Sequence, residues 1–467
     1  MFSVRRRGVA RLAAATLVSG LVAAGSMAIA GPAMAEDADQ GTGGATATLG
    51  DLKIYDTVEI KDSHRKVSAG LFEMSVKPGG FIQTYCIDLY TGAKTGQEYK
   101  EVGWDQSSLH NNKDAGKIRW ILQNSYPQVN DLTSLAAKAG AAKLTEKTAA
   151  AATQAAIWHF SDDVEAVPVD ADAAKLTKYL EDKAVELDEP TASLSLSPSS
   201  VAGKAGGRLG PITVDTNSGT AKVSLAPGAP AGVTIVDKDG KAVTDVADGS
   251  KVYFDVPAGT ADGTAELNVQ ADTTVPIGRA FVATKVKSQT LILAGTSTST
   301  VSAKATASWA KQGPVPSVTA EKNCAKGGVD ITLANKGDEA WELDLKGVKY
   351  AIAAGESKTV TVPVAEDEAY KFTITGPNGF EKVIEGVLDC KTATPGPTPS
   401  ETPSGTPAPS ETPATGGTTG GSTTGGGDLA ETGSSSATPM IAGIAAALLV
   451  VGGGAVFFLR KKKPAGQ

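Results

Sequence analysis

Residues 81–90 read FIQTYCIDLY, and this stretch decides how the N-terminal part of the chain folds. β-Branched and aromatic residues fill it, which is typical of a β-strand. Successive side chains of a strand point to opposite faces, so Thr84, Cys86 and Asp88 should share one face. The sequence therefore predicts a strand that carries a cysteine, with an acidic residue two positions further along.

Cys86 is the unpaired member of three cysteines in a chain of 467 residues. Cys324 and Cys390 bracket one short C-terminal segment and form a natural disulfide pair in an oxidising compartment. An unpaired extracellular cysteine is buried and inert, pairs between chains, or is chemically committed. The third outcome requires a partner residue for Cys86.

Gln154 is the candidate partner. The alanine-rich stretch from Thr145, a good N-cap, to about Phe160 has the apolar spacing of a helix, and Gln154 falls on its buried face. A buried primary amide costs roughly 1–3 kcal/mol unless its polar atoms are bonded. A thiol and a carboxamide in contact can lose ammonia and close an internal thioester, so we expect the sulfur of Cys86 to lie within reach of the side-chain carbonyl carbon of Gln154. Asp88 is a candidate proton carrier for this chemistry.

Two short segments resemble the signatures of a known family. YCID at 85–88 and TQAAIW at 153–158 are similar to the two motifs of the thioester domains of Gram-positive surface proteins, and residues 116–127 resemble that family's inserted helix. The resemblance covers roughly the first third of the mature chain. It implies an α+β thioester domain over 36–190 and a Cys86–Gln154 cross-link that a passing amine opens, remaining attached through an amide.

The N-terminus has the features of a secretory signal peptide over residues 1–35. Arginines at 5–7 precede an apolar stretch from about 15 to 30, and AMA at 33–35 predicts cleavage before Glu36. The general export route is favoured over the twin-arginine route because the consensus around the arginines is poor. The mature chain is therefore predicted to leave the cytosol.

The C-terminus has the features of a surface anchor. An apolar span at 440–459 is followed by RKKK, and about 20 helical residues at 1.5 Å each cross a bilayer core. The preceding LAETG resembles a sortase sorting signal, with alanine in place of proline as in high-GC actinobacteria. The resemblance implies cleavage after the threonine and attachment to the cell wall; a plain single-pass anchor is the alternative. The motif residues are Leu429, Ala430, Glu431, Thr432 and Gly433.

Between the two ends the composition favours β-domains on an extended stalk. With 53 Gly, 24 Pro and few aromatic residues, the sequence predicts short strands separated by Pro-Gly and Asp-Gly turns. These strands are predicted at 212–215, 234–236, 251–256, 329–333, 358–362 and 370–374. We predict a mostly β, multidomain chain with a disordered linker and a C-terminal transmembrane helix. Its parts after the thioester domain are a β-sandwich (191–312), a small Ig-like domain with the disulfide (313–392), a Pro/Thr/Ser/Gly-rich wall-spanning linker (393–428) and the sorting signal (429–467).

Several function classes are excluded or disfavoured. The three histidines, His64, His110 and His159, have no metal-ligand spacing, and the net charge of −7 argues against nucleic acid. No metal or cofactor is expected. A cysteine-nucleophile enzyme of the transglutaminase or peptidase type lacks a convincing triad.

We therefore expect a covalent adhesin that reacts once and is not a turnover enzyme. Its partner would be an amine-bearing protein or a polyamine on a host, a neighbouring cell or a matrix. Sortase and peptidoglycan would be partners at the other end, and the precursor would span the membrane before sorting. The alternatives left open are the surface enzyme and a structural stalk protein in which Cys86 is merely buried.

Overall fold

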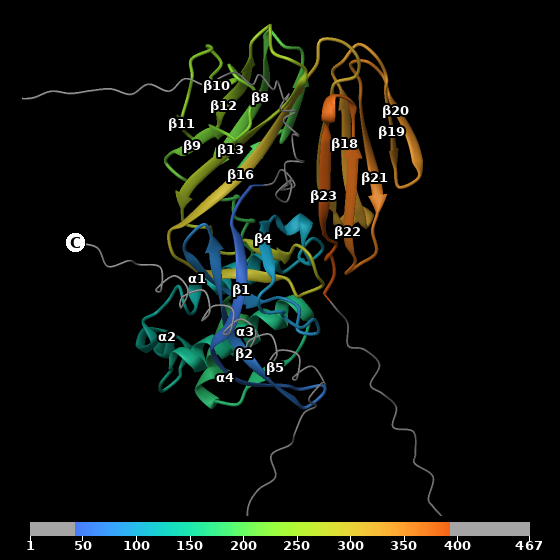
Figure 1. Cartoon of the computed structure of the whole chain (residues 1–467). Coiled ribbons are helices and arrows are strands. Elements are labelled where there is room, and N and C mark those ends of the chain that lie inside the picture. The colour runs from blue at the N-terminus through green and yellow to red at the C-terminus, as the bar shows by residue number, and fades with distance from the viewer. Residues whose placement is uncertain (1–42, 393–467) are drawn as a thin grey trace, which may run out of the picture. The chain divides into compact units, whose positions relative to one another are not determined.

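The computed structural model describes residues 43–392, all within one compact unit (residues 1–398). The predicted signal peptide (1–35), linker (393–428) and sorting signal (429–467) lie outside the described residues. Within residues 43–392, no helix is both long enough and apolar enough to cross a membrane. This part of the chain is mostly β-structure, with its α-helices confined to residues 115–183 (Figure 1).

A seven-stranded sheet organises the N-terminal domain, in the order β2-β3-β15-β14-β4-β1-β5. Because β1 also pairs with β2, six of these strands close on themselves into a ring, as in a small barrel. β3 lies between β2 and β15 and ends at Cys86. The bounds are β1 Thr46–Ile60, β2 Arg65–Lys77, β3 Phe81–Cys86, β4 Glu98–Val102, β5 Ala166–Pro168, β14 Ala280–Ala283 and β15 Leu291–Thr296.

Strands β14 and β15 come from a region that the sequence prediction had given wholly to the β-sandwich, residues 191–312. They pair instead with β4 and β3 of the N-terminal sheet, and Figure 1 shows these yellow strands among the blue ones. Along both strands consecutive residues are buried, so buried and exposed positions do not alternate. Such strands are covered on both faces. The N-terminal domain therefore comprises residues 44–183 together with 280–296.

A buried ion pair fastens this hairpin to the sheet. Nε of Arg279 lies 3.0 Å from Oε1 of Glu101, and Nη1 of Arg279 lies 2.7 Å from Oε1 of Glu189. Glu101 is 1% exposed and also accepts hydrogen bonds from the backbone N–H groups of Ala45 and Ser193, each at 3.0 Å. One carboxylate thus ties β4, the start of the described chain, the hairpin and the connection to the next domain.

Four α-helices pack on the N-terminal sheet, α1 Ala115–Asn124, α2 Leu132–Ala139, α3 Glu146–Asp162 and α4 Ala171–Lys183. Helix α3 begins with a capping box in which the side chains of Thr145 and Thr148 bond each other's backbone N–H groups. Every residue from 149 to 158 is buried. Its many alanines explain this, because their small side chains let a helix be enclosed on all sides without overpacking.

Two sheets form the middle sandwich. Inward-facing residues from both sheets, such as Val214 and Val269, belong to one apolar cluster. The strands predicted at 212–215, 234–236 and 251–256 lie within β8, β10 and β12. One sheet consists of β10 Thr234–Val236, β12 Ser250–Val256, β8 Gly207–Thr216 and β6 Leu194–Ser197. The other consists of β11 Asp245–Val246, β9 Ala221–Leu225, β13 Gly263–Thr273, β16 Ser299–Trp309 and β7 Ser200–Gly203.

The C-terminal domain, residues 316–391, has its own core around Trp341 and Phe372. Cys324 and Cys390 form a disulfide across 66 residues and close the two ends of the domain, while Cys86 is a free, buried thiol. The strands predicted at 329–333, 358–362 and 370–374 lie within β18, β21 and β22. The strands are β17 Pro316–Asn323, β18 Gly328–Asn335, β19 Trp341–Leu345, β20 Val348–Ile352, β21 Ser357–Pro363, β22 Ala369–Thr375 and β23 Glu381–Val387.

Candidate functional site

The side-chain amide of Gln154 lies against the backbone of Cys86, although the two residues are 68 positions apart. The N–H of Cys86 donates to Oε1 of Gln154 at 2.9 Å, and Nε2 of Gln154 donates to the carbonyl oxygen of Cys86 at 2.8 Å. Gln154 is completely buried and Cys86 is 6% exposed. These paired bonds give the buried amide hydrogen-bond partners, and they place its carbonyl carbon beside the residue that carries the thiol.

Helix α3 supplies Gln154 from its enclosed middle. The preceding Thr153 is also buried, and its hydroxyl donates to the carbonyl oxygen of Ala149 at 2.8 Å, so it needs no partner outside the helix. On the other side of the contact, the hydroxyl of Tyr85 donates to the carbonyl oxygen of Tyr126 at 2.8 Å. Tyr85, which precedes Cys86, and Thr153, which precedes Gln154, thus help to fix strand β3 and helix α3.

The Cys86 thiol has a strongly raised pKa. Burial is the main cause, and the nearby carboxylates of Asp162 and Asp88 add to it, while a hydrogen bond with Gln289 acts in the opposite direction. A free thiol in this setting stays protonated at neutral pH. Cysteine nucleophiles of turnover enzymes have lowered pKa values, so this environment differs from theirs.

Asp88, the predicted proton carrier, is 2% exposed and shapes the turn after β3. Its Oδ1 accepts hydrogen bonds from the backbone N–H groups of Tyr90 and Thr91, both at 3.1 Å. This is an Asx turn, in which the side chain of Asp88 holds the local backbone.

Asp162 is a site residue that the sequence reasoning missed. It ends helix α3, where its Oδ1 accepts from the N–H of Leu89 at 3.0 Å and its Oδ2 accepts from the hydroxyl of Ser161 at 2.7 Å. Burial raises the pKa of Asp162 to about 7, although these two hydrogen bonds oppose the rise. Its spacing of eight residues from Gln154, which keeps it on one helical stripe, was the available signal.

The connection between β14 and β15 forms the third wall of the site, and no sequence pattern indicated this. Leu291 pairs with Cys86 across the sheet, and the N–H of Ile87 donates to the carbonyl oxygen of Thr290 at 3.2 Å. The hydroxyl of Tyr99 donates to Oγ of Ser288 at 2.6 Å. Residues about two hundred positions beyond Cys86 therefore complete its surroundings.

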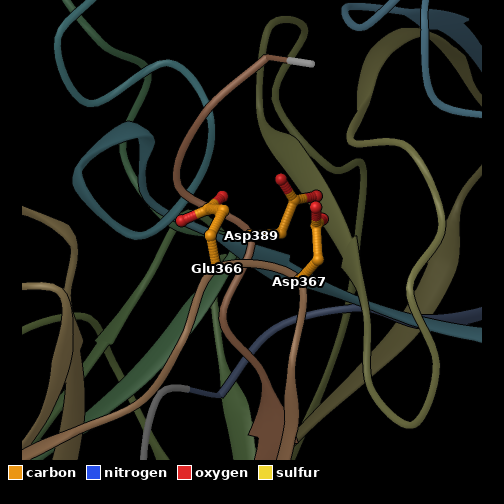
Figure 2. A group of neighbouring side chains, drawn as sticks. All are labelled: Glu366, Asp367 and Asp389. Carbon is orange, nitrogen blue, oxygen red and sulfur yellow. The ribbon is translucent and has the colours of Figure 1, made fainter. Parts of the chain in front are cut away.

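The C-terminal domain reaches the same loop. Thr290 donates its hydroxyl hydrogen to Oδ2 of Asp389 at 2.6 Å, and Nζ of Lys287 lies 2.5 Å from Oδ2 of Asp367. Asp389, Asp367 and Glu366 form an acidic cluster whose oxygens lie within 4.8 Å of one another (Figure 2). Oε1 of Glu366 accepts two backbone N–H bonds, from residues 390 and 391. Each carboxylate therefore already has a protein partner.

His159 takes no part in this arrangement. It follows Trp158 and is exposed, on the side of α3 away from Gln154. Within residues 43–392, the groups that act on the Cys86 thiol are carboxylates and an amide, and none of them is a histidine. The sortase motif, residues 429–433, lies outside the described residues.

Comparisons with known families match two segments of the chain, and the first of them contains both sequence motifs, at 85–88 and 153–158. Residues 83–186 match the family model described as Thioester domain, and residues 316–387 match the model described as Bacterial phospholipase C, C-terminal domain. A search of the curated proteins finds no match. The first match contains both Cys86 and Gln154, so the chain carries a thioester domain.

Solved structures of two thioester proteins are similar to the chain. The Bacillus anthracis TIE protein is 17% identical, with 74% of this chain and 64% of that chain covered and a TM-score of 0.27. The thioester domain of the Enterococcus faecium TIE86 protein is 20% identical, with coverages of 57% and 97% and a TM-score of 0.27. The chain thus spans less than two thirds of the length of the first.

Proposed function

We propose that this protein attaches covalently to amines through an internal thioester between Cys86 and Gln154. One observation carries the proposal: a completely buried carboxamide is held by two hydrogen bonds against the backbone of the unpaired cysteine, inside the segment that matches the thioester-domain model. If Gln154 served only to pack the core, the buried free thiol of Cys86 beside it would have no role.

The chemistry has two steps. The sulfur of Cys86 first attacks the side-chain carbonyl carbon of Gln154, the C–N bond breaks, and ammonia leaves with the thiol proton. Later an amine attacks the same carbon, the C–S bond breaks with its electron pair going to sulfur, and the proton lost by the amine ends on the thiol. The amine remains bound to Gln154 as an amide, so each molecule reacts once.

Both steps require a proton carrier, and the site offers Asp162 for this role. A carboxyl group with a pKa of about 7 is present in both protonation states at neutral pH and can accept and return a proton. Asp88 was the candidate from sequence; its Oδ1 accepts two backbone hydrogen bonds in the turn after β3. We assign the proton transfer to Asp162, because the raised pKa of its carboxyl group suits this role.

The proposed partner is an amine-bearing protein or a polyamine on a host, neighbouring cell or matrix surface. The proposed location is the cell surface, with anchoring to the cell wall by sortase after export through the membrane. Support for the location is the signal-like N-terminus and the LAETG sequence at 429–433. A lysine side chain or a polyamine supplies a primary amine, which attacks after its ammonium group has lost a proton.

Intact-mass measurement tests the proposal. Purified protein should weigh one ammonia less than its sequence once the disulfide is counted, and its Cys86 should resist thiol reagents. Methylamine should then add once, at Gln154, and free the thiol for alkylation. Cys86→Ala and Gln154→Ala should each abolish the mass deficit, whereas the exposed Gln123→Ala should retain it as a matched control.

The enzyme alternative predicts a different result. A cysteine that turns over substrate would show full mass at rest and an alkylatable Cys86, and Gln154→Ala would be tolerated. Full mass in freshly purified protein that has never met an amine would refute the thioester.

A further inference from the structure

The backbone of Cys86 holds both polar ends of the Gln154 amide. Its N–H donates to Oε1 at 2.9 Å and its carbonyl oxygen accepts from Nε2 at 2.8 Å, and both bonds are buried. Closing the thioester removes only one of these two groups, because Oε1 stays on the acyl carbon while Nε2 departs with ammonia. The carbonyl oxygen of Cys86 therefore loses its donor in the step that makes the protein reactive.

The Gln154 amide stands in for a neighbouring strand at Cys86. On the side of β3 that faces β15, the N–H of Ile87 donates to the carbonyl oxygen of Thr290 at 3.2 Å. Neighbouring residues of an antiparallel strand direct their N–H and C=O groups to opposite sides, so those of Cys86 point away from β15. On this second side, the pairing of β3 with β2 ends at Thr84, before it reaches Cys86. In the described part of the chain, the sheet thus supplies no second donor for this carbonyl oxygen.

We propose that the carbonyl oxygen of Cys86 is the group that binds the attacking amine, and that it makes the site specific for primary amines. This inference rests on the proposed thioester. Attack by an amine is the reverse of thioester closure, with an alkyl group in place of one hydrogen of ammonia. The entering nitrogen therefore passes through the position that Nε2 of Gln154 leaves, where its N–H donates to the carbonyl oxygen of Cys86.

A primary amine carries the two hydrogens that this path requires. Its uncharged nitrogen bonds to the acyl carbon of Gln154, the C–S bond breaks with its electron pair going to sulfur, and one proton from the nitrogen ends on the Cys86 thiol. The other hydrogen stays on the new amide and donates to the carbonyl oxygen of Cys86. Within residues 43–392, Nε2 has no other acceptor, so its second hydrogen marks the position of the alkyl group.

Other nucleophiles leave this carbonyl oxygen without a donor. A secondary amine gives a tertiary amide and a hydroxyl gives an ester, and neither product has a hydrogen on the atom that replaces Nε2. A buried acceptor that has lost its donor is costly. During attack the nitrogen gains positive charge, so the N–H of a primary amine becomes a stronger donor as the reaction proceeds. The partner class is thus a lysine side chain or the terminal nitrogen of a polyamine, and not an internal secondary nitrogen or a sugar hydroxyl.

Ethylamine and dimethylamine test this selectivity, because they are isomers of similar basicity and only ethylamine keeps an N–H after attack. Intact mass follows their addition to purified full-length protein. Each rate is divided by the rate with a small thioester of N-acetylcysteine in the same buffer, which accounts for the intrinsic reactivity of each amine. We expect the protein to favour ethylamine over dimethylamine about tenfold more than the small thioester does. Cys86→Ala protein cannot form the thioester and should gain neither amine.

Three outcomes count against the proposals, and they are distinguishable. The same preference in the protein and the small thioester would overturn the inference. Failure of both isomers while methylamine reacts would also overturn it, because size alone would then limit the site. Wild-type protein without an ammonia deficit would instead show that the thioester itself is wrong.

The reaction products provide a second measurement, which does not depend on rates. The ethylamine and dimethylamine adducts contain the same atoms and the same free thiol, but only the ethylamine adduct restores the hydrogen bond to the carbonyl oxygen of Cys86. Calorimetry of protein fully converted by prolonged exposure should give an unfolding temperature roughly 3 °C lower for the dimethylamine adduct. Equal unfolding temperatures would contradict the restored bond.

The same rule applies to protein partners. A peptide that contains one lysine should be captured, whereas the same peptide with monomethyl-lysine should be captured about tenfold more slowly. Monomethyl-lysine is the matched probe, because it keeps the positive charge and the length of the side chain but carries a secondary amine. Capture of both peptides at one rate would exclude the carbonyl oxygen of Cys86 as the selecting group.

Discussion

Asp162 shows how one residue at the site differs from its sequence neighbours. It stands at the end of the helix that carries Gln154, and two hydrogen bonds hold its carboxyl group toward the turn after β3. Burial outweighs those bonds, so the carboxyl holds its proton up to a pKa of about 7. At low pH the buried carboxyl of Asp162 is protonated and neutral, so its burial costs the folded state little. When it ionises at higher pH, the buried charge destabilises the folded state.

Asp162→Asn should therefore change the pH dependence of stability. The folded pKa lies above the unfolded value of about 3.9, so the folded state binds more protons between about pH 4 and pH 7, and ionisation of Asp162 lowers the free energy of unfolding as pH rises through that window. Asp162→Asn has no ionisable group at this position, so it does not lose this stability as the pH rises. Relative to wild type it should gain roughly 2–4 kcal/mol between pH 4 and pH 8.

Denaturant unfolding at pH 4, 6 and 8 measures this difference. Burial also raises the pKa of Asp389 to about 7, but Asp389 is present in both proteins and its effect cancels. Asp163→Asn, at the exposed neighbouring position, is the control for loss of a carboxyl group from this end of the helix. Parallel curves for Asp162→Asn and wild type would show that this carboxyl ionises normally.

At the scale of elements, the hairpin β14–β15 matters most, because residues 287–290 between its strands form the third wall of the site. Its two strands pair with β4 and β3, and its base carries the buried Arg279–Glu101 ion pair. Removing one member of a buried pair leaves the other charge without compensation. The position of the site's third wall therefore depends on a charge contact distant from the sulfur.

Arg279→Met should lower the free energy of unfolding by roughly 3–5 kcal/mol, since methionine keeps the apolar part of the side chain and leaves Glu101 without its cation. Lys304→Met provides the comparison. It removes the exposed pair with Glu266, whose partners are 32% and 33% exposed, and should cost at most about 1 kcal/mol. Denaturant titration measures both; similar small losses would mean that the Arg279 pair has no net effect.

At the scale of the whole molecule, the cysteines are of two kinds: two form a disulfide and one is a free thiol. Cys324 and Cys390 close the C-terminal domain, and Cys86 lies alone in the N-terminal domain. In the chain-entropy model, closing a loop of this length stabilises a domain by about 4 kcal/mol. The same bond fixes the segment that carries Asp389.

The double variant Cys324→Ser/Cys390→Ser should lower the unfolding temperature of the C-terminal domain and retain the ammonia mass deficit, because the thioester uses neither sulfur. Calorimetry and intact-mass measurement of the same sample check the two expectations. Substitution is preferable to chemical reduction, since an added thiol would itself attack a thioester. Peptide mapping that joined Cys86 to either of the other cysteines would contradict this division.

The sequence by itself determined the reactive pair and most of the local structure. Tyr85-Cys86-Ile87-Asp88 and the run from Thr153 to Trp158 carry their information in adjacent residues. The helical cap at Thr145 and the alternation along β8 and β12 are likewise local signals. Such features depend on backbone geometry and on the spacing of side chains along a helix or strand. Both can be read from one short segment of sequence.

Only the tertiary structure decided what surrounds the sulfur. Residues 280–296 form two short apolar runs that are compatible with any buried strand, and their partners, β4 and β3, lie about two hundred residues earlier. Asp162 acquires its raised pKa from burial, and Thr290 meets Asp389 across the boundary between two domains. Pairing and desolvation depend on the whole folded chain, and no window of sequence contains them.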